Sequence, residues 1–200
     1  MRKLTVLNNV SLDGVMQAPG RPDEDRRDGF DHGGWSMPYN DEVKGRTIGE
    51  GMGGPADLVF GRRTYEDFYE VWPKRTDNPF TPVLNASRKY VASRTLRDPL
   101  PWENSVLLQG NAADAIERLK NEPGNDLLVM GSGVLLASLM HRHLVDQYVL
   151  CIHPLVLGSG RRMFPDDGAA FAKLTLVRSV PTTTGVIIAT YRPADSAEAQ

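Results

Sequence analysis

The chain has 200 residues, of which 40% are hydrophobic and 24% charged, with 23 basic and 25 acidic side chains. A net charge of -2 argues against a protein that binds nucleic acid over a broad basic face, so any anion site is expected to be local. The single cysteine, Cys151, excludes an internal disulfide and favours a reducing compartment, the cytoplasm. No apolar run approaches the roughly 18 residues that a membrane span needs, so we expect a soluble protein with no membrane partner.

The N-terminal segment predicts a strand that ends at a tight turn. Residues 3–10 form a short apolar run with β-branched side chains, and Asp13-Gly14 is a common turn pair. A carboxyl group just past a strand end can act in proton transfer with a bound substrate directly or through water. Asp13 is therefore a candidate catalytic residue, and the alternative is that it only begins the turn.

A long loop is predicted over residues 17–41, which are rich in glycine, proline and acidic side chains. Connections longer than about 12–15 residues are often functional. Three aromatic side chains of this loop are candidates for an apolar lid over a flat substrate ring, with ordinary packing as the alternative: Phe30, Trp35 and Tyr39. A helix is expected to begin at Asn40 and to end in the glycines of residues 51–55. Asp41 in its first turn is a candidate substrate contact or a charge that stabilises the helix terminus.

The middle of the chain alternates strands and helices. Four strands are predicted over residues 57–60, 89–94, 105–109 and 126–130. The first and last of them lead through Gly61 and Gly131 into helical patterns, and Asn111 is placed to cap another helix. Thr64, with Asp67 three residues on, resembles a capping box. The alternation predicts a three-layer αβα fold around a mostly parallel central sheet.

The C-terminal part has a different pattern, with strands predicted over residues 147–157, 173–180 and 185–191. The last two are close enough in sequence to pair across a turn, so antiparallel strands are expected at the end of the sheet. Residues 1–193 are expected to form one domain and residues 194–200 a disordered tail. The spacing of the histidines and carboxylates matches no metal site, so no metal is expected.

The two glycine turns after strands are the candidate cofactor site. Backbone N–H groups at the start of a helix can bind phosphate oxygens, and glycine lets the backbone approach them closely. Arg62 or Arg63 in the first turn and Arg94 at the end of the third strand would add positive charge for a phosphate. The alternative is that each glycine only makes a tight turn and each arginine is a solvated surface charge.

Six short segments follow one another along the chain: Ser-Leu-Asp-Gly (11–14), Leu-Val-Phe-Gly-Arg-Arg-Thr-Tyr-Glu (58–66), Tyr-Val-Ala-Ser-Arg-Thr (90–95), Leu-Leu-Val-Met-Gly-Ser-Gly-Val-Leu (127–135), Val-Asp-Gln-Tyr (145–148) and Leu-Gly-Ser-Gly-Arg-Arg-Met-Phe-Pro-Asp (157–166). In this order they resemble the dihydrofolate reductase-like superfamily, and within it the reductase domain of riboflavin biosynthesis and its stand-alone relatives. The resemblance covers about residues 2 to 192. It implies a mostly parallel sheet with an antiparallel C-terminal strand, bound NADPH and a homodimer.

The resemblance also implies roles for individual residues. It assigns the adenosine phosphates to the turn from Gly61 through Arg62 or Arg63 to Thr64, and the 2′-phosphate to Ser93 and Arg94. It assigns the pyrophosphate to Gly131, Ser132, Gly133, Val134 and Leu135, and the nicotinamide to the backbone of Asn9 and Val10. Asp13 matches an aspartate on the substrate side in the riboflavin-type reductases.

Two positions depart from the family pattern. The dihydrofolate reductases keep a carboxylate on the helix after the first strand, whereas here Asp41 and Glu42 are offset from that position, and an acidic residue before the glycine turn is replaced by Met130. The substrate is therefore not identified. We expect an NADPH-dependent reductase that transfers a hydride to a small heterocyclic (pteridine- or pyrimidine-like) or carbonyl substrate. The alternative is a catalytically inactive nucleotide-binding or dimerising module, or a sensor, of the same fold.

Overall fold

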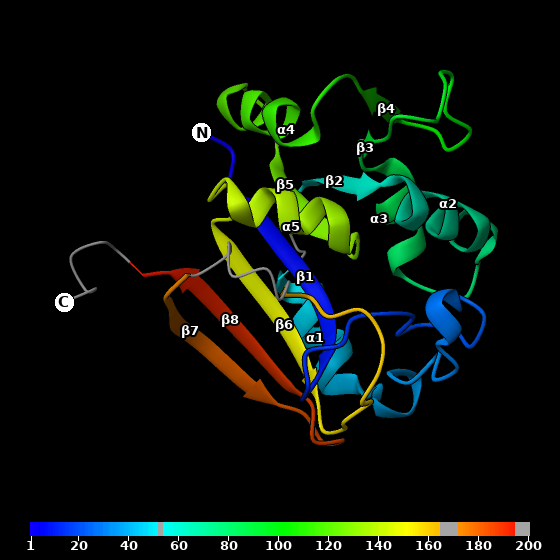
Figure 1. Ribbon diagram of the computed structural model, residues 1–200, viewed down its shortest axis with the longest axis vertical. Helices are drawn as coiled ribbons and strands as arrows, with labels where there is room; N and C mark the ends of the chain where they lie inside the picture. The colour runs from blue at the N-terminus through cyan, green and yellow to red at the C-terminus, as the bar shows by residue number, and fades with distance from the viewer. Residues whose placement is uncertain (52–53, 165–171, 195–200) are drawn as a thin grey trace. The chain divides into compact units, whose positions relative to one another are not determined.

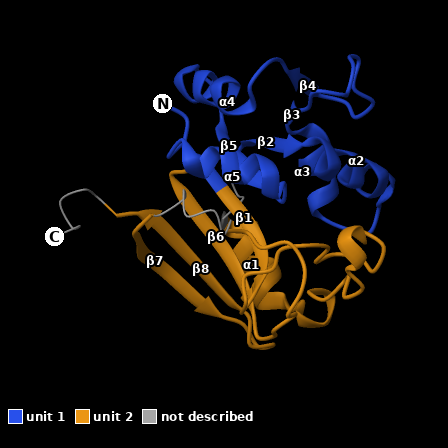
Figure 2. Cartoon of the chain, viewed as in Figure 1, with its two compact units in different colours: residues 1–5, 55–144 blue, residues 6–54, 145–200 orange. Residues whose placement is uncertain are grey.

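The computed structural model describes residues 1–51, 54–164 and 172–194. The chain divides into two compact units, unit 1 with residues 1–5 and 55–144 and unit 2 with residues 6–54 and 145–200 (Figure 2). The expected single domain over residues 1–193 stays a prediction. The expected disordered tail lies, from residue 195 onward, outside the described residues.

Unit 1 contains the parallel strands. They are β2 (Ala56–Gly61), β3 (Lys89–Ala92), β4 (Ser105–Leu108) and β5 (Asp126–Met130), in the spatial order β4-β3-β2-β5. Each pairing in this row is parallel. Leu58, Val59 and Phe60 of β2 are all buried, because a parallel strand covered on both faces needs a continuous apolar run rather than an alternating one.

The helical elements of unit 1 are α2 (Arg62–Val71), η3 (Trp72–Lys74), α3 (Phe80–Ala86), α4 (Ala112–Asn121) and α5 (Gly133–His141). Of these, α2 and α5 contact β2, and α4 packs on α5. Asn111 caps α4 as predicted, since its side chain accepts hydrogen bonds from the N–H groups of Ala113 and Asp114. The predicted capping box at Thr64 is wrong, because α2 begins at Arg62 with Gly61 as its cap. Helix α3 has no counterpart among the predicted elements.

Unit 2 contains the antiparallel strands. They are β6 (Gln147–His153), β7 (Leu174–Pro181) and β8 (Ile187–Pro193). The unit also holds β1 (Leu4–Ser11) from Val6 onward, and β1 lies between β5 and β6 in the sheet. Strand β8 pairs antiparallel with both β6 and β7, which lie on either side of it (Figure 1). The eight strands of the structure therefore form the predicted mixed sheet, mostly parallel with antiparallel C-terminal strands. Strand β6 ends at His153 and not at residue 157, since Pro154 follows.

The long loop between β1 and α1 (Glu42–Gly51) is packed on its own apolar core. It contains two short 3-10 turns, η1 (Arg27–Gly29) and η2 (Met37–Tyr39). The buried side chains of Phe30 and Trp35 cluster with Val15 and Ala18, and the Trp35 indole Nε1–H donates to the Gln17 carbonyl at 2.7 Å. For Phe30 and Trp35 this is the packing alternative given above. None of the described helices is long and apolar enough to cross a membrane.

Candidate functional site

The two glycine turns of unit 1 are joined by side-chain hydrogen bonds. The Gly61 N–H donates to Ser132 Oγ at 2.7 Å, and Ser132 Oγ in turn donates to Thr64 Oγ1 at 2.9 Å. The Ser132 N–H also donates to Thr64 Oγ1, at 3.1 Å. The turn after β2 and the turn after β5 are therefore held against each other by one serine and one threonine. This explains why Thr64 does not act as a cap: its hydroxyl serves the neighbouring turn.

The turn after β5 requires glycine at its first position. Gly131 has a φ of +65°, and a Cβ added there would lie 3.0 Å from Thr64 Cγ2. Ser132 also has a positive φ, 61°, and it precedes the first residue of α5. The left-handed backbone of these two successive residues turns the chain from β5 into α5. The first N–H groups of a helix have no acceptor within the helix itself.

The predicted cofactor residues around these turns differ in exposure. Arg62 pairs with Glu66 one turn along α2, with Nη1 and Oε2 3.1 Å apart, whereas Arg63 is exposed. At the start of α5 the Val134 side chain is 80% exposed and the Leu135 side chain is buried. Of the two arginines, Arg63 is thus the one whose guanidinium is not engaged by Glu66.

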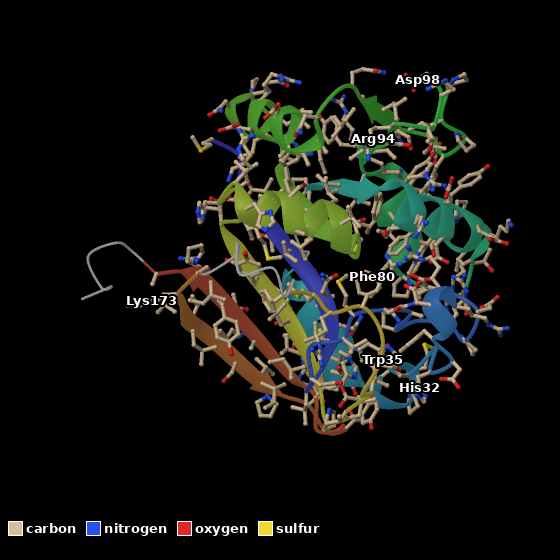
Figure 3. The ribbon with its side chains drawn as sticks, viewed as in Figure 1. His32, Trp35, Phe80, Arg94, Asp98 and Lys173 are labelled. Carbon is tan, nitrogen blue, oxygen red and sulfur yellow. The ribbon has the colours of Figure 1, made fainter. Side chains whose placement is uncertain are left out.

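A cavity of about 560 Å³ opens where β3 and β4 end. Its lining includes the predicted residues Ser93 and Arg94, together with three polar side chains that the sequence did not single out: Arg97, Asp98 and Gln109. Arg94 and Asp98 are labelled in Figure 3 on the segment that follows β3. The Ser93 hydroxyl accepts hydrogen bonds from the N–H groups of Thr95 and Leu96, so it shapes this segment. Two guanidinium groups and one carboxylate give the cavity a net positive charge.

In unit 2, Asp13 is engaged by its own neighbourhood. Its carboxylate accepts hydrogen bonds from Ser11 Oγ at 2.6 Å and from the N–H groups of Leu157 and Gly158 at 3.1 and 2.8 Å. These bonds, that from Ser11 first, lower the pKa of Asp13 to about 2. A carboxyl group with this pKa is ionised at neutral pH, and the contacts favour a role in fixing the 157–158 turn.

Asp41 connects the start of α1 to the turn between β7 and β8. Its Oδ1 accepts the Lys44 N–H at 2.7 Å, and its Oδ2 accepts both the N–H and the hydroxyl of Thr183 at 2.7 Å. These hydrogen bonds, the one from the Lys44 backbone first, hold the pKa of Asp41 well below its usual range. These contacts correspond to the alternative in which Asp41 is a charge that stabilises the helix terminus. Asp41 also links this terminus to the turn between β7 and β8.

A buried polar cluster in unit 2 surrounds His153. The His153 Nε2 lies 3.0 Å from Asn9 Oδ1 and 3.5 Å from Lys44 Nζ. Trp35 and Tyr39 contact the imidazole edge to face, with ring centroids 5.1 and 5.5 Å away. Burial, with the Lys44 charge as a further cause, lowers the pKa of His153 to about 4, so the ring is neutral at pH 7. Burial also lowers the pKa of Lys44.

Sequence reasoning missed both Lys44 and His153. A signal for Lys44 was available, because Lys44 and Ile48 are four residues apart and so share one face of α1, and Ile48 packs on the core. A lysine on the apolar face of a helix is unusual and merits attention. The prediction for Asn9 concerned its backbone, whereas here its side chain contacts His153. Within the part of the chain that the structure describes, no three histidine, cysteine or carboxylate side chains are grouped to hold a metal.

Comparison with known proteins agrees with this fold. The chain matches the family model of the RibD C-terminal domain over residues 2–188. It is 27% identical to the uncharacterized protein YyaP of Bacillus subtilis strain 168 over 138 residues, which are 67% of this chain and 72% of YyaP.

Two examples from the solved structures resemble nearly the whole chain. One is a protein of Shewanella sp. PV-4 assigned to riboflavin biosynthesis, with a TM-score of 0.69 and 22% identity, covering 97% of this chain and 99% of that one. The other is the dihydrofolate reductase of Enterococcus faecalis in complex with NADP(H), with a TM-score of 0.62 and 14% identity, covering 96% of this chain and 97% of that one. The expected dihydrofolate reductase-like fold is confirmed.

Proposed function

The chain belongs to the family of RibD C-terminal domains, and we therefore propose that it is an NADPH-dependent reductase. Its substrate would be a small heterocyclic compound, pteridine- or pyrimidine-like, or a carbonyl compound. The fold is of a reductase type, and a solved relative of this fold binds NADP(H). Bound NADPH would supply the hydride, and the residues of this chain would bind and orient the cofactor and the substrate.

The observation that carries the proposal is the cavity of about 560 Å³ with Arg94 and Arg97 in its lining. Cavities of this size accommodate a small molecule or part of a cofactor. Arginine recognises phosphate through paired, charge-assisted hydrogen bonds, which suits the 2′-phosphate that distinguishes NADPH from NADH. The first turn of α5, which begins at Gly133, would bind the pyrophosphate through its backbone N–H groups.

The proposal leaves Asp13 a candidate catalytic residue, but its hydrogen bonds and its low pKa support a structural role at neutral pH. Phe30 and Trp35 would support the substrate side as packed walls rather than as a lid. Tyr39, which is half-buried beside His153, is the aromatic side chain of the three with access to solvent.

Cofactor binding by matched variants tests the proposal. We expect the wild type to bind NADPH more tightly than NADH, as measured by calorimetric titration. Arg94→Ala and Arg97→Ala should each weaken the affinity for NADPH by about 10-fold or more, since a hydrogen bond to a charged group contributes about 1.5–3 kcal/mol. Neither variant should change the affinity for NADH much. Arg118→Ala, an exposed arginine on α4, is the control. Equal losses for both cofactors, or no binding, would refute the assignment.

The alternative function, a nucleotide-binding module without catalysis, is favoured by the side chain on the helix after the first strand. The buried polar residue there is Lys44, not a carboxylate. Binding of NADPH without its oxidation against panels of dihydropteridines, pyrimidines and carbonyl compounds would support this alternative.

We also propose that the chain forms a homodimer through β7. Leu176 and Val177 of this strand are 51% and 50% exposed, and a second copy would cover these apolar side chains. Light scattering would show a monomer if this is wrong, and Val177→Asp should dissociate the dimer if it is right.

A further inference from the structure

The cluster around Lys44 contains a buried cation without an anionic partner. Lys44 is 5% exposed, and its Nζ lies 3.1 Å from Asn40 Oδ1 and 3.5 Å from His153 Nε2. Both contacts are to neutral groups at pH 7. Among the described residues no carboxylate forms an ion pair with Nζ, although the charge of Asp41 acts on it from a greater distance, and a buried ammonium is costly to keep without a direct partner.

The cluster also contains a buried polar atom without a hydrogen-bond partner among the described residues. His153 is fully buried, and its Nδ1 has no hydrogen-bond partner in the described part of the chain. An ammonium has three N–H groups, and the contacts above use at most two of them, because His153 Nε2 accepts from Lys44 only in the tautomer that carries its proton on Nδ1. Lys44 and His153 thus retain hydrogen-bonding capacity in a place where water is excluded, and buried polar groups are normally satisfied.

One of the Lys44 partners is on the surface. Asn40 is exposed and lies between η2 and α1, and its Nδ2 makes only a weak contact of 3.6 Å with the Met37 sulfur. Tyr39 beside it is half-buried. A ligand oxygen could take the place of Asn40 Oδ1 at Lys44 Nζ by turning one surface side chain, while the core of the unit stays as it is.

We propose that Lys44 and His153 form a binding site for the carboxylate of a small-molecule substrate, and that the Asn40 amide oxygen occupies the place of that carboxylate in the free protein. The proposal deepens the proposed function, on which the identification of the ligand as a substrate rests. A carboxylate satisfies the ammonium in charge and in hydrogen bonding at once. Trp35 and Tyr39 pack edge to face on the His153 ring, so aromatic side chains border the proposed site, which suits an acid that carries an aromatic or heterocyclic ring.

The test titrates the cofactor-free protein with sodium benzoate and observes the imidazole nitrogens of the four histidines by NMR. We expect a saturable shift of the His153 resonances, with those of exposed His32 unchanged at matched ionic strength. Lys44→Met should abolish the shift. Arg46→Met, which removes an exposed cation from the same helix, should leave it intact.

A second variant keeps the lysine in place and guards against misfolding of Lys44→Met. Asn40→Asp puts a carboxylate where the ligand carboxylate is proposed to lie, so benzoate affinity should fall at least about 10-fold while the thermal midpoint rises. Wild-type affinity in either variant would overturn the proposal, and so would a wild type that binds inorganic phosphate but not benzoate, or neither. Because no cofactor is present, this outcome is independent of whether NADPH binds.

Discussion

Replacement of Gly131 by alanine should destabilise the protein more than the same change at Gly110. Both glycines have positive φ, +65° and +77°, and both belong to unit 1. A Cβ at Gly110 would meet no atom within 4 Å, whereas a Cβ at Gly131 would lie 3.0 Å from Thr64 Cγ2 and 3.2 Å from Thr64 Oγ1. Thr64 cannot give way easily, because its hydroxyl accepts two hydrogen bonds from Ser132.

The two variants separate backbone strain from steric conflict. A left-handed conformation costs a residue with a Cβ about 1–2 kcal/mol, which is all that Gly110→Ala should lose. Gly131→Ala adds the overpacking against Thr64, about 1–3 kcal/mol, so its total should be about 2–5 kcal/mol. Urea unfolding followed by tryptophan fluorescence measures both free energies. Equal destabilisation of the two variants would refute the argument that Thr64 and Gly131 are held in fixed contact.

Four further outcomes are expected. Ser132→Ala removes the acceptor of the Gly61 N–H and should cost about 1–3 kcal/mol in urea unfolding; a loss under about 0.5 kcal/mol would contradict the link. The pKa of Asp13 in the folded protein is lowered to about 2. The Asp13 carboxylate should therefore add about 1 kcal/mol, after allowance for solvent screening, to the free energy of unfolding above about pH 4, and this stabilisation should be lost as the pH falls toward 2. Asp13→Asn should flatten that part of the acid unfolding curve, and an unchanged curve would contradict this. The Cys151 thiol, whose pKa burial raises to about 11, should resist a disulfide reagent at pH 8 until the chain unfolds, and fast native labelling would show otherwise. Asp98→Asn removes a negative charge from the cavity and should tighten NADPH several-fold at low salt; weaker binding would mean that Asp98 holds the cofactor.

Much of the fold followed from local pattern. The continuous apolar runs of β2 and β5 and the cap at Asn111 are short-range signals, and each corresponds to an observed element. Helix α3 was not predictable in the same way, because it has seven residues and contains Pro82 near its start. The end of β6 was misplaced because its apolar pattern continues past Pro154, where the strand stops.

The parts of the candidate site that depend on residues adjacent in the sequence were predictable. Gly131 and Gly61 were identified because a glycine after a strand is visible in the sequence. The hydrogen bond between the hydroxyl groups of Ser132 and Thr64 joins residues 68 positions apart, so no local sequence pattern predicts it. The same holds for Asp13, whose backbone donors lie at residues 157–158. His153 is likewise set apart only by its contacts with Asn9 and Lys44, which are distant from it in the sequence.

The cavity at the ends of β3 and β4 has a consequence for how cofactor preference can evolve. Arg94, Arg97 and Asp98 are exposed and lie outside the regular elements, so their replacement should change stability by less than about 0.5 kcal/mol. The turns that would bind the pyrophosphate have no such freedom, because Gly131 and Ser132 are fixed by Thr64. Under the proposed function, a few surface substitutions at Arg94, Arg97 and Asp98 should therefore suffice to shift the preference between a phosphorylated and an unphosphorylated dinucleotide without loss of stability.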